Sequence, residues 1–220
     1  MVDELSLYLP FWDKLTAAEQ RQLQERSALQ RYKKGTILHR GGNDCLGVLQ
    51  VKSGRLRTYL LSAEGREITL FHVLPGEICL LSASCILNHI TFDVFISVEE
   101  DTEVIRIPAD SMAQISDTNV YAENFLYKMT AQRFSDVMQA LQQVLFMGFD
   151  QRLATFLLEE SARSGRPVIH MTHEQIAREV GSAREVVSRT ARQFAEAGWI
   201  SLARGSITLL DEEGLRSQLD

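Results

Sequence analysis

A short stretch near the C-terminus carries polar side chains at a spacing that suits base recognition in DNA. At i, i+3, i+4 and i+7 stand Glu185, Ser188, Arg189 and Arg192, which an α-helix places on one face. Arginine matches the O6 and N7 acceptors of guanine, and glutamate accepts from the N4 amino group of cytosine. We therefore expect Arg184, Glu185 and Arg189 to read bases. Arg192 and Arg204 are expected to bind phosphates.

Two short helices joined by a tight turn are needed to position these side chains. Thr172 and Gln175 form a capping-box pattern that opens the first helix, and Gly181 ends it. Ser182 is expected to cap the second helix, whose buried face consists of Val187, Thr190, Ala191 and Phe194. Residues 199–202 and 207–210 flank a glycine turn and predict a β-hairpin. The segment therefore predicts a winged helix-turn-helix.

The charge distribution limits how such a segment can bind nucleic acid. The chain of 220 residues has a net charge of −6, and residues 149–220 hold nine arginines, no lysine and eleven acidic residues. The net charge argues against a protein that coats nucleic acid non-specifically, but it is compatible with a small local basic patch. Residues 181–204 carry four arginines against two glutamates. Affinity should then depend on a few contacts with strong sensitivity to salt.

The sequence pattern of the N-terminal half is typical of a β domain. A short helix is expected from Thr16, where Thr16 and Glu19 form a capping box. Residues 32–108 contain short apolar runs separated by turn signals about every ten residues, which predicts a sandwich or barrel of antiparallel strands. The strand cores are residues 37–38, 46–49, 56–60, 68–71 and 104–107, with turns expected at 52–54 and 99–101.

Residues 115–147 contain neither proline nor glycine and predict one long helix. Its apolar stripe recurs at steps of three and four, and a dimer interface is expected at Phe134, Val137, Met138, Leu141 and Leu145. The length of the helix favours a coiled-coil-like seam, while packing of the stripe on the β domain stays an alternative. Gly148 breaks the pattern, and Asp150 is expected to cap the next helix over 151–161.

The apolar runs, the N-terminal residues and the cysteine content indicate the cellular compartment of the protein. No apolar run approaches the length of about 18–20 residues that a membrane span requires, and the N-terminus lacks a basic region followed by an apolar stretch. We expect a cytoplasmic protein without a membrane partner. Three cysteines, Cys45, Cys79 and Cys85, are a sparse set that fits a reducing compartment and cannot form a disulfide scaffold.

With these motifs together, the chain resembles the CRP/FNR family of bacterial transcription regulators over nearly its full length. The resemblance rests on residues 32–36, 51–56, 74–77, the long helix, 172–177 and 182–189. It implies an α+β fold: a cupin-like, cyclic-nucleotide-binding-type antiparallel β-roll that senses an effector (1–114), a dimerisation helix and hinge (115–148) and a winged-helix DNA-binding domain (149–220). The implied function is a homodimeric regulator of an inverted-repeat operator in double-stranded DNA, with RNA polymerase as a partner, no cofactor and no enzymatic activity.

The resemblance also carries residue roles. The family's base-reading arginine, glutamate, serine and arginine fall on Arg184, Glu185, Ser188 and Arg189 with unchanged spacing. Thr172, at the start of the first helix, is expected at the DNA as well.

The sensor departs from its cyclic-AMP-binding relatives, which carry a glycine–glutamate pair and an arginine–serine pair that holds the cyclic phosphate. Here Leu80-Leu81 replaces the first pair and Phe92-Asp93 replaces the second. A carboxylate at the phosphate position repels the phosphate. We therefore expect an unknown small-molecule effector other than a cyclic nucleotide, bound by Leu80, Leu81, Phe92 and Asp93.

Two alternatives remain open. A metal-dependent cupin-type enzyme would use His39, His72 and His89 with Glu77, although the His-x-His pair of metal cupins is missing. His170 and His173 are three residues apart, but they adjoin the helix-turn-helix. A cysteine-based redox sensor would use Cys79 and Cys85, although cysteines among apolar neighbours are more often inert.

Overall fold

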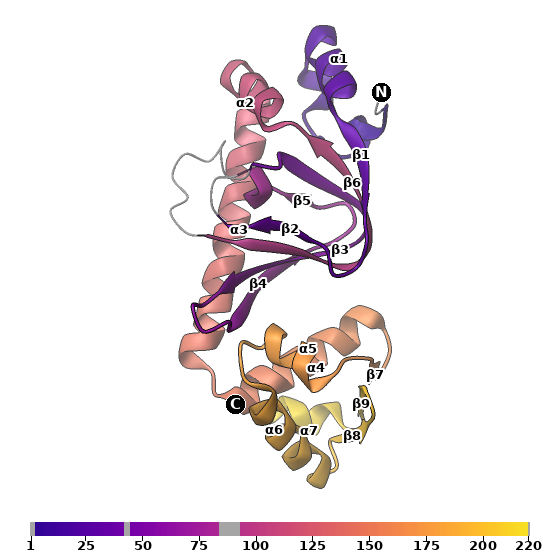
Figure 1. The fold of residues 1–220 in the computed structure, drawn as a ribbon, viewed down its shortest axis with the longest axis vertical. Helices are drawn as coiled ribbons and strands as arrows, with labels where there is room; N and C mark the ends of the chain where they lie inside the picture. The colour runs from indigo at the N-terminus through magenta and orange to yellow at the C-terminus, as the bar shows by residue number, and fades with distance from the viewer. Residues whose placement is uncertain (1–2, 42–44, 84–92, 220) are drawn as a thin grey trace. The chain divides into compact units, whose positions relative to one another are not determined.

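The computed structural model describes residues 3–41, 45–83 and 93–219 and is shown in Figure 1. The chain forms two compact units, one of residues 1–60 and 70–137 and the other of residues 61–69 and 138–220. No helix in the described ranges is both long and apolar enough to cross a bilayer.

The sheet domain contains six strands and several short helices, and it leads into the long helix α3. In chain order they are η1 (Asp3–Leu7), η2 (Trp12–Lys14), α1 (Ala17–Arg26), β1 (Ala28–Tyr32), β2 (Ile37–Arg40), β3 (Val48–Leu61), β4 (Glu67–Val73), β5 (Ile78–Cys79), η3 (Leu81–Ala83), β6 (Phe95–Ile107), α2 (Ala109–Thr118) and α3 (Val120–Phe146). Strands β1, β2 and β3 each pair antiparallel with β6, and β5 pairs with β3. The main strand order is β1-β6-β3-β4.

The C-terminal elements form a smaller mixed unit. They are α4 (Phe149–Ser164), β7 (Val168–Ile169), α5 (His173–Glu179), α6 (Arg184–Glu196), β8 (Ile200–Ala203), β9 (Ser206–Leu209) and α7 (Glu212–Arg216). Strands β7, β9 and β8 form an antiparallel sheet in that order. The predicted α+β class, with an antiparallel sheet domain, a long helix and a C-terminal helix-turn-helix, is confirmed.

Strands β3 and β6 are longer than the sequence predicts. The expected turns at residues 52–54 and 99–101 are wrong, because both segments lie inside continuous strands whose register shifts between Val51 and Leu56. Gly54 has φ +82°, a left-handed conformation that suits glycine. A Cβ there would meet the Thr102 hydroxyl and lie 2.5 Å from the Asp101 carbonyl oxygen. A bulge therefore replaces the turn, and it lets the two strands continue.

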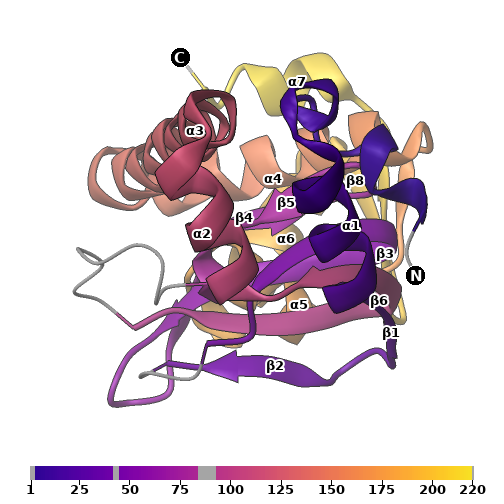
Figure 2. The same cartoon turned by 90° about the horizontal axis from the view of Figure 1, so that it is seen from above.

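Helices α1 and α2 pack against each other at one end of the sheet (Figure 2). The predicted capping box is confirmed, because the Glu19 amide donates to Thr16 Oγ1 and the Thr16 amide donates to Glu19 Oε2 at 2.6 Å. Arg26 in turn binds Asp110 at 2.7 Å. Beneath these helices lies a core of buried residues that includes Leu5, Leu9, Leu23, Ile105, Ile107, Met112 and Leu126.

The single helix predicted over residues 115–147 is instead two helices. Asn119 takes an extended conformation between α2 and α3, with φ −125°. Its side-chain Oδ1 accepts from the amides of Tyr121 and Ala122 at 3.0 and 3.3 Å. Asparagine is a preferred N-cap, so this residue ends one helix and starts the next. Helix α3 is therefore 27 residues long.

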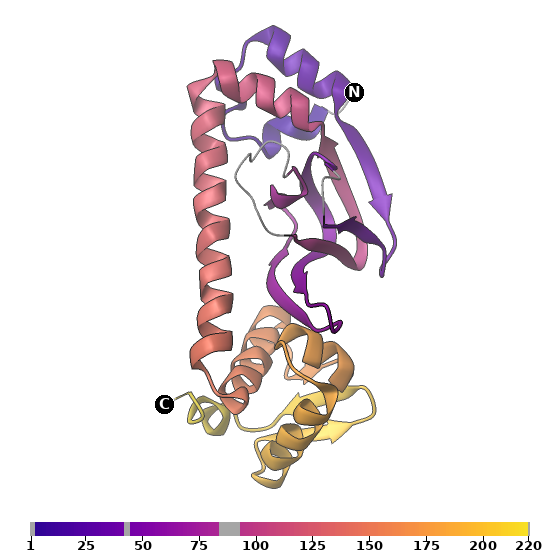
Figure 3. The ribbon, with the colours of Figure 1, turned by 60° about the vertical axis from the view of Figure 1, so that its left-hand side comes forward.

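Helix α3 is followed directly by helix α4 (Figure 3). Two side-chain contacts hold the junction between them. Helix α4 starts at Phe149 with Gly148 as its N-cap, and the Gly148 amide donates to Gln151 Oε1 at 2.9 Å. The expected cap at Asp150 is wrong, because that residue lies inside the helix. Arg152 Nη1 donates to the Val144 carbonyl at 3.1 Å. This contact supplies positive charge to a helix end whose own last turn has no basic residue.

The bulge at Gly54 yields a prediction on stability. Replacing Gly54 by alanine should lower the free energy of unfolding by about 2–4 kcal/mol, since strain at positive φ adds to a clash with β6. Gly65 is a matched control, because it has φ +80° but no atom within 4 Å of a Cβ. Gly65→Ala should cost only about 1 kcal/mol. Urea unfolding followed by circular dichroism measures both, and equal losses would contradict the steric role of Gly54.

Candidate nucleic-acid interface

Helices α5 and α6 form a helix-turn-helix, and most of its predicted caps and turns are found. Thr172 caps α5 by accepting from the Gln175 amide at 3.2 Å, and Gln175 Oε1 accepts from the Thr172 amide at 2.8 Å. The chain then turns through Gly181 at φ +62°. The expected cap at Ser182 is wrong, because the N-cap of α6 is Ala183 and it makes no side-chain capping bond.

Helix α6 has one buried and one exposed face, as predicted. Its buried residues are Val187, Thr190, Ala191 and Phe194, which join the core of the C-terminal unit. Trp199 extends this core, with its ring centre 5.4 Å from that of Phe194. Packing of this face fixes the helix, so the opposite side chains project from a rigid support.

The polar residues expected on the exposed face are found there. Arg184, Glu185, Arg189 and Arg192 are exposed and Ser188 is half-buried. A DNA major groove admits an α-helix, and polar side chains on its exposed face can then reach base edges.

Most arginines elsewhere on the helices of this unit are neutralised by neighbours, which makes the α6 set distinctive. Three pairs join an arginine to a glutamate three or four residues away: Arg163 with Glu160, Arg178 with Glu174, and Arg216 with Glu212. In the described part of the chain, no carboxylate is within ion-pair distance of Arg184, Arg189, Arg192 or Arg204. These four guanidinium groups keep their full charge for an external anion.

One residue of this surface was not predicted from the sequence. His173, in the first turn of α5, is half-buried, and the pKa of its imidazole is lowered by desolvation and by the positive charges of Arg184 and Arg192. An influence of both arginines on one imidazole means that the start of α5 lies close to the charged face of α6. The only sequence signal was the position of His173 next to Thr172.

The hairpin behind α6 carries the remaining predicted cation. Strands β8 and β9 pair from Ile200 with Leu209 to Ala203 with Ser206. Arg204 is exposed in the turn between them, and Gly205 beside it has φ +76°. The hairpin thus presents one arginine at its tip, as a wing does.

The predicted dimer residues are mostly solvent-exposed apolar side chains on α3. Phe134, Met138, Leu141 and Leu145 are 67%, 42%, 38% and 68% exposed, whereas Val137 is half-buried. The stripe also includes Val120 and Tyr127, which were missed and are 65% and 70% exposed. The side of α3 that carries Ala122 and Leu126 packs into the sheet domain's core instead. The stripe and the packing face are therefore different surfaces of one helix.

The structure describes three of the four predicted effector residues, and the effector site stays a prediction. Leu80 is 1% exposed and belongs to the core cluster beneath the N-terminal helices, while Leu81 is 6% exposed. Asp93 is exposed beside Gly41. Phe92 lies outside the described residues.

Arg133 is a cation near the sheet that the sequence reasoning overlooked, because α3 brings it close from a distant part of the chain. Its side chain is 11% exposed and lies 4.7 Å from the centre of the Phe71 ring. It pairs with Asp136 at 2.8 Å and with Glu77 at 3.7 Å.

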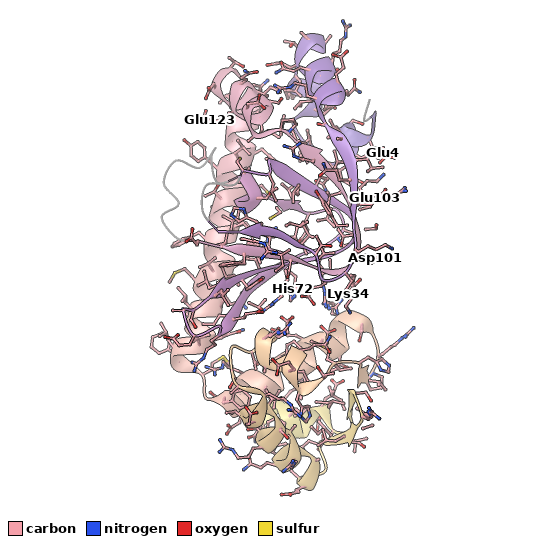
Figure 4. The ribbon with its side chains drawn as sticks, in the orientation of Figure 1. Glu4, Lys34, His72, Asp101, Glu103 and Glu123 are labelled. Carbon is pink, nitrogen blue, oxygen red and sulfur yellow. The ribbon has the colours of Figure 1, made fainter. Side chains whose placement is uncertain are left out.

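Three acidic residues of the sheet domain form ion pairs within it. Glu4, Asp101 and Glu103, labelled in Figure 4, bind Lys52 at 2.5 Å, Lys33 at 2.6 Å and Arg31 at 2.6 Å respectively. Hydrogen bonds from Lys33 and Arg31 lower the pKa values of Asp101 and Glu103. These charges are satisfied within the domain.

The cysteines of the redox-sensor alternative and the histidines of the metal-enzyme alternative differ in their burial. Cys79 is free and buried, and burial raises the pKa of its thiol, which opposes formation of a reactive thiolate. Cys45 is disulfide-bonded, and Cys85 lies outside the described residues. His39 is buried, His72 is half-buried (Figure 4), and His89 lies outside the described residues. Among described residues, no three His, Cys, Asp or Glu side chains lie close enough to hold a metal ion.

Comparisons with known proteins agree with this architecture. Residues 29–119 match the family model of the cyclic nucleotide-binding domain, and residues 151–218 match that of the Crp-like helix-turn-helix domain. A solved structure from Eubacterium rectale, assigned to the CRP/FNR family of transcriptional regulators, is 44% identical, with a TM-score of 0.93, and the match covers 97% of this chain and 99% of that chain.

Two curated relatives point the same way. The transcriptional activator protein FnrA of Stutzerimonas stutzeri is 31% identical over 191 residues, which cover 83% of this chain and 77% of that protein. The transcriptional activator protein Anr of Pseudomonas aeruginosa is 30% identical over 187 residues, 81% of this chain and 75% of that protein. The matched helix-turn-helix domain, the structure from Eubacterium rectale and these relatives together show that the chain belongs to the CRP/FNR family of DNA-binding transcription regulators.

Proposed function

We propose that the chain acts as a homodimer that recognises an inverted-repeat operator through α6 and responds to a small molecule bound in the domain of residues 1–114. In this division, residues 115–148 form the dimerisation helix and hinge, and residues 149–220 bind DNA. The observation that carries the proposal is the set of α6 arginines without carboxylate partners beside an exposed Glu185. RNA polymerase is the expected protein partner.

Within each half-site, Arg184 and Arg189 pair with guanines and Glu185 accepts from a cytosine amino group, while Ser188 completes the base contacts. Arg192, Arg204 and Thr172 contact phosphates. The exposure of all three arginine-bearing positions on α6 supports these roles, as does Arg204 at the tip of the hairpin. Phosphate contacts fix the position of the helix, and base contacts give it sequence preference.

A second copy of the chain supplies the second half-site. The stripe of α3 leaves large apolar side chains in water, including Phe134 at 67% and Leu145 at 68% exposure. Burying them against the same stripe of a partner removes this unfavourable surface. Two-fold symmetry then sets the half-sites about 10 base pairs apart, so that both α6 helices face the same side of the duplex.

The effector is a molecule other than a cyclic nucleotide. A buried phosphate must be paired with a cation, and the position of the family's arginine–serine pair holds Phe92-Asp93. Arg133 is the basic side chain that α3 brings to the sheet, and it is already engaged by Asp136 and Glu77. The chemistry of the residues therefore supports an uncharged or more apolar ligand.

The base-reading roles can be tested without knowing the operator. Randomised duplexes selected by the wild-type protein give the preferred half-site, and the variants are then compared on it. Arg189→Ala should lose about 1–3 kcal/mol of discrimination at one base pair per half-site. Arg204→Ala should weaken all sequences alike and reduce the salt slope by about 1.

Arg216→Ala is the control for loss of one positive charge, because Arg216 is paired with Glu212 on α7. It should leave both the sequence preference and the affinity unchanged. If Arg189→Ala weakened all duplexes equally, Arg189 would be a phosphate contact and its base-reading role would be rejected.

The dimer seam has its own test. Leu141→Glu places a charge in the apolar stripe and should convert the dimer to a monomer, because a carboxylate cannot be buried there without a partner. Gln139→Glu adds the same charge at an exposed position of α3 outside the stripe and should leave the dimer intact. Light scattering gives the mass, and circular dichroism checks the fold. A folded, dimeric Leu141→Glu variant would contradict the assignment.

The effector argument predicts a negative result. Calorimetric titration of the purified protein with cyclic AMP and with cyclic GMP should show no saturable heat at micromolar concentrations, since the Asp93 carboxylate would repel the phosphate. Saturable binding of either nucleotide in the micromolar range would show that the ligand phosphate finds another cation.

A further inference from the structure

The exposed stripe of α3 follows a heptad repeat. Alternating steps of four and three residues connect Val120, Asn124, Tyr127, Ala131, Phe134, Met138, Leu141 and Leu145, and all eight are exposed. A sustained 4–3 spacing keeps one seam facing a partner helix and is the pattern of a coiled coil. In heptad notation, Asn124, Ala131, Met138 and Leu145 occupy a positions, and Tyr127, Phe134 and Leu141 occupy d positions.

Asn124 is the polar exception in this seam. An asparagine at an a position pairs with the same asparagine of the other helix when two strands run parallel and in register. Any shift would bury its carboxamide against apolar side chains without a hydrogen-bond partner, which is unfavourable. Asn124 therefore disfavours shifted and antiparallel pairings of the two α3 helices.

The flanking positions carry an independent signal. The e and g positions beside the seam are uncharged except for Glu123 at g and Lys128 at e; the others are Tyr121, Thr130, Ser135, Val137, Gln142 and Val144. In a parallel, in-register pair, a g residue faces the e residue five positions further along the partner helix. Glu123 then faces the partner's Lys128, and symmetry repeats the pair.

Both charges are available for such a contact. Glu123, labelled in Figure 4, and Lys128 are exposed, and neither forms an ion pair with any residue in the described ranges. Residues five apart on one helix do not face each other, so the two cannot pair within one chain. An antiparallel or shifted arrangement would place Glu123 opposite uncharged side chains.

We propose that Glu123, Asn124 and Lys128 form a register lock, which makes α3 pair parallel and in register with a second copy of this chain. The inference rests on the proposed homodimer and adds its polarity, its alignment and the residues that select the partner. The apolar stripe supplies the affinity, and the register lock decides between arrangements.

Complementary charge reversal tests the register lock. Glu123→Lys alone places two lysines opposite each other at both sites, and Lys128→Glu alone places two glutamates there. Each variant should dimerise more weakly than the wild type, while their mixture pairs opposite charges at both sites. Native mass spectrometry with one variant labelled by nitrogen-15 counts the species. The square of the heterodimer concentration, divided by the product of the two homodimer concentrations, should exceed its value for random mixing at least about tenfold.

The double variant Glu123→Lys with Lys128→Glu should recover the wild-type dissociation constant, which separates charge pairing from damage to the fold. Mixed Gln139→Lys and Gln139→Glu variants are the matched control and should exchange at random, because Gln139 lies on α3 away from the seam. Random mixing of the Glu123 and Lys128 variants, with a dimeric wild type, would overturn the register lock and leave the homodimer standing. A monomeric wild type would overturn both.

Discussion

Helix α3 has to satisfy two unlike surfaces at once, and the rest of the molecule is arranged around this requirement. One side packs Ala122 and Leu126 into the core of the sheet domain, where they are 0% and 7% exposed. The other side keeps Phe134 and Leu145 in water. Because both faces belong to one rigid rod, a change in the sheet domain that moves the buried face also moves the exposed one. Arg133 adds a contact between α3 and the sheet domain, because it pairs with Glu77 at 3.7 Å.

The features that could be predicted from the sequence are those governed by neighbouring residues. The capping boxes that start at Thr16 and Thr172 form as expected. Each needs only a hydroxyl at the N-cap and a Glu or Gln side chain three residues later. The buried and exposed faces of α6 follow from helical periodicity alone. The cap of α6 was misassigned because serine is a preferred N-cap, whereas the helix begins one residue later, at Arg184, and leaves Ala183 at the cap without a capping side chain.

The features that could not be predicted depend on contacts between distant residues. Gly54 and the acidic residues 99–101 look like turns in isolation, but pairing of β3 with β6 carries both strands through them. Arg133 approaches Phe71 and Glu77 only once α3 has packed on the sheet. For the same reason Leu80, expected at an effector site, belongs to a core formed with the N-terminal helices. Periodicity indicates which face of an element is apolar, and not what that face packs against.

The pairing of β1 with β6 has a consequence for how the chain folds during synthesis. Ala28 pairs with Arg106 and Tyr32 with Thr102, so the first strand has no partner until nearly half of the chain has been made. Loop closure over such a separation is slow, and unpaired strand edges invite association with other chains in the meantime. The contacts of the C-terminal unit among α4, α5, α6 and the hairpin are short in sequence, which favours rapid folding. The sheet domain is therefore the part of the chain that we expect to fold more slowly and to be exposed to association for longer during synthesis.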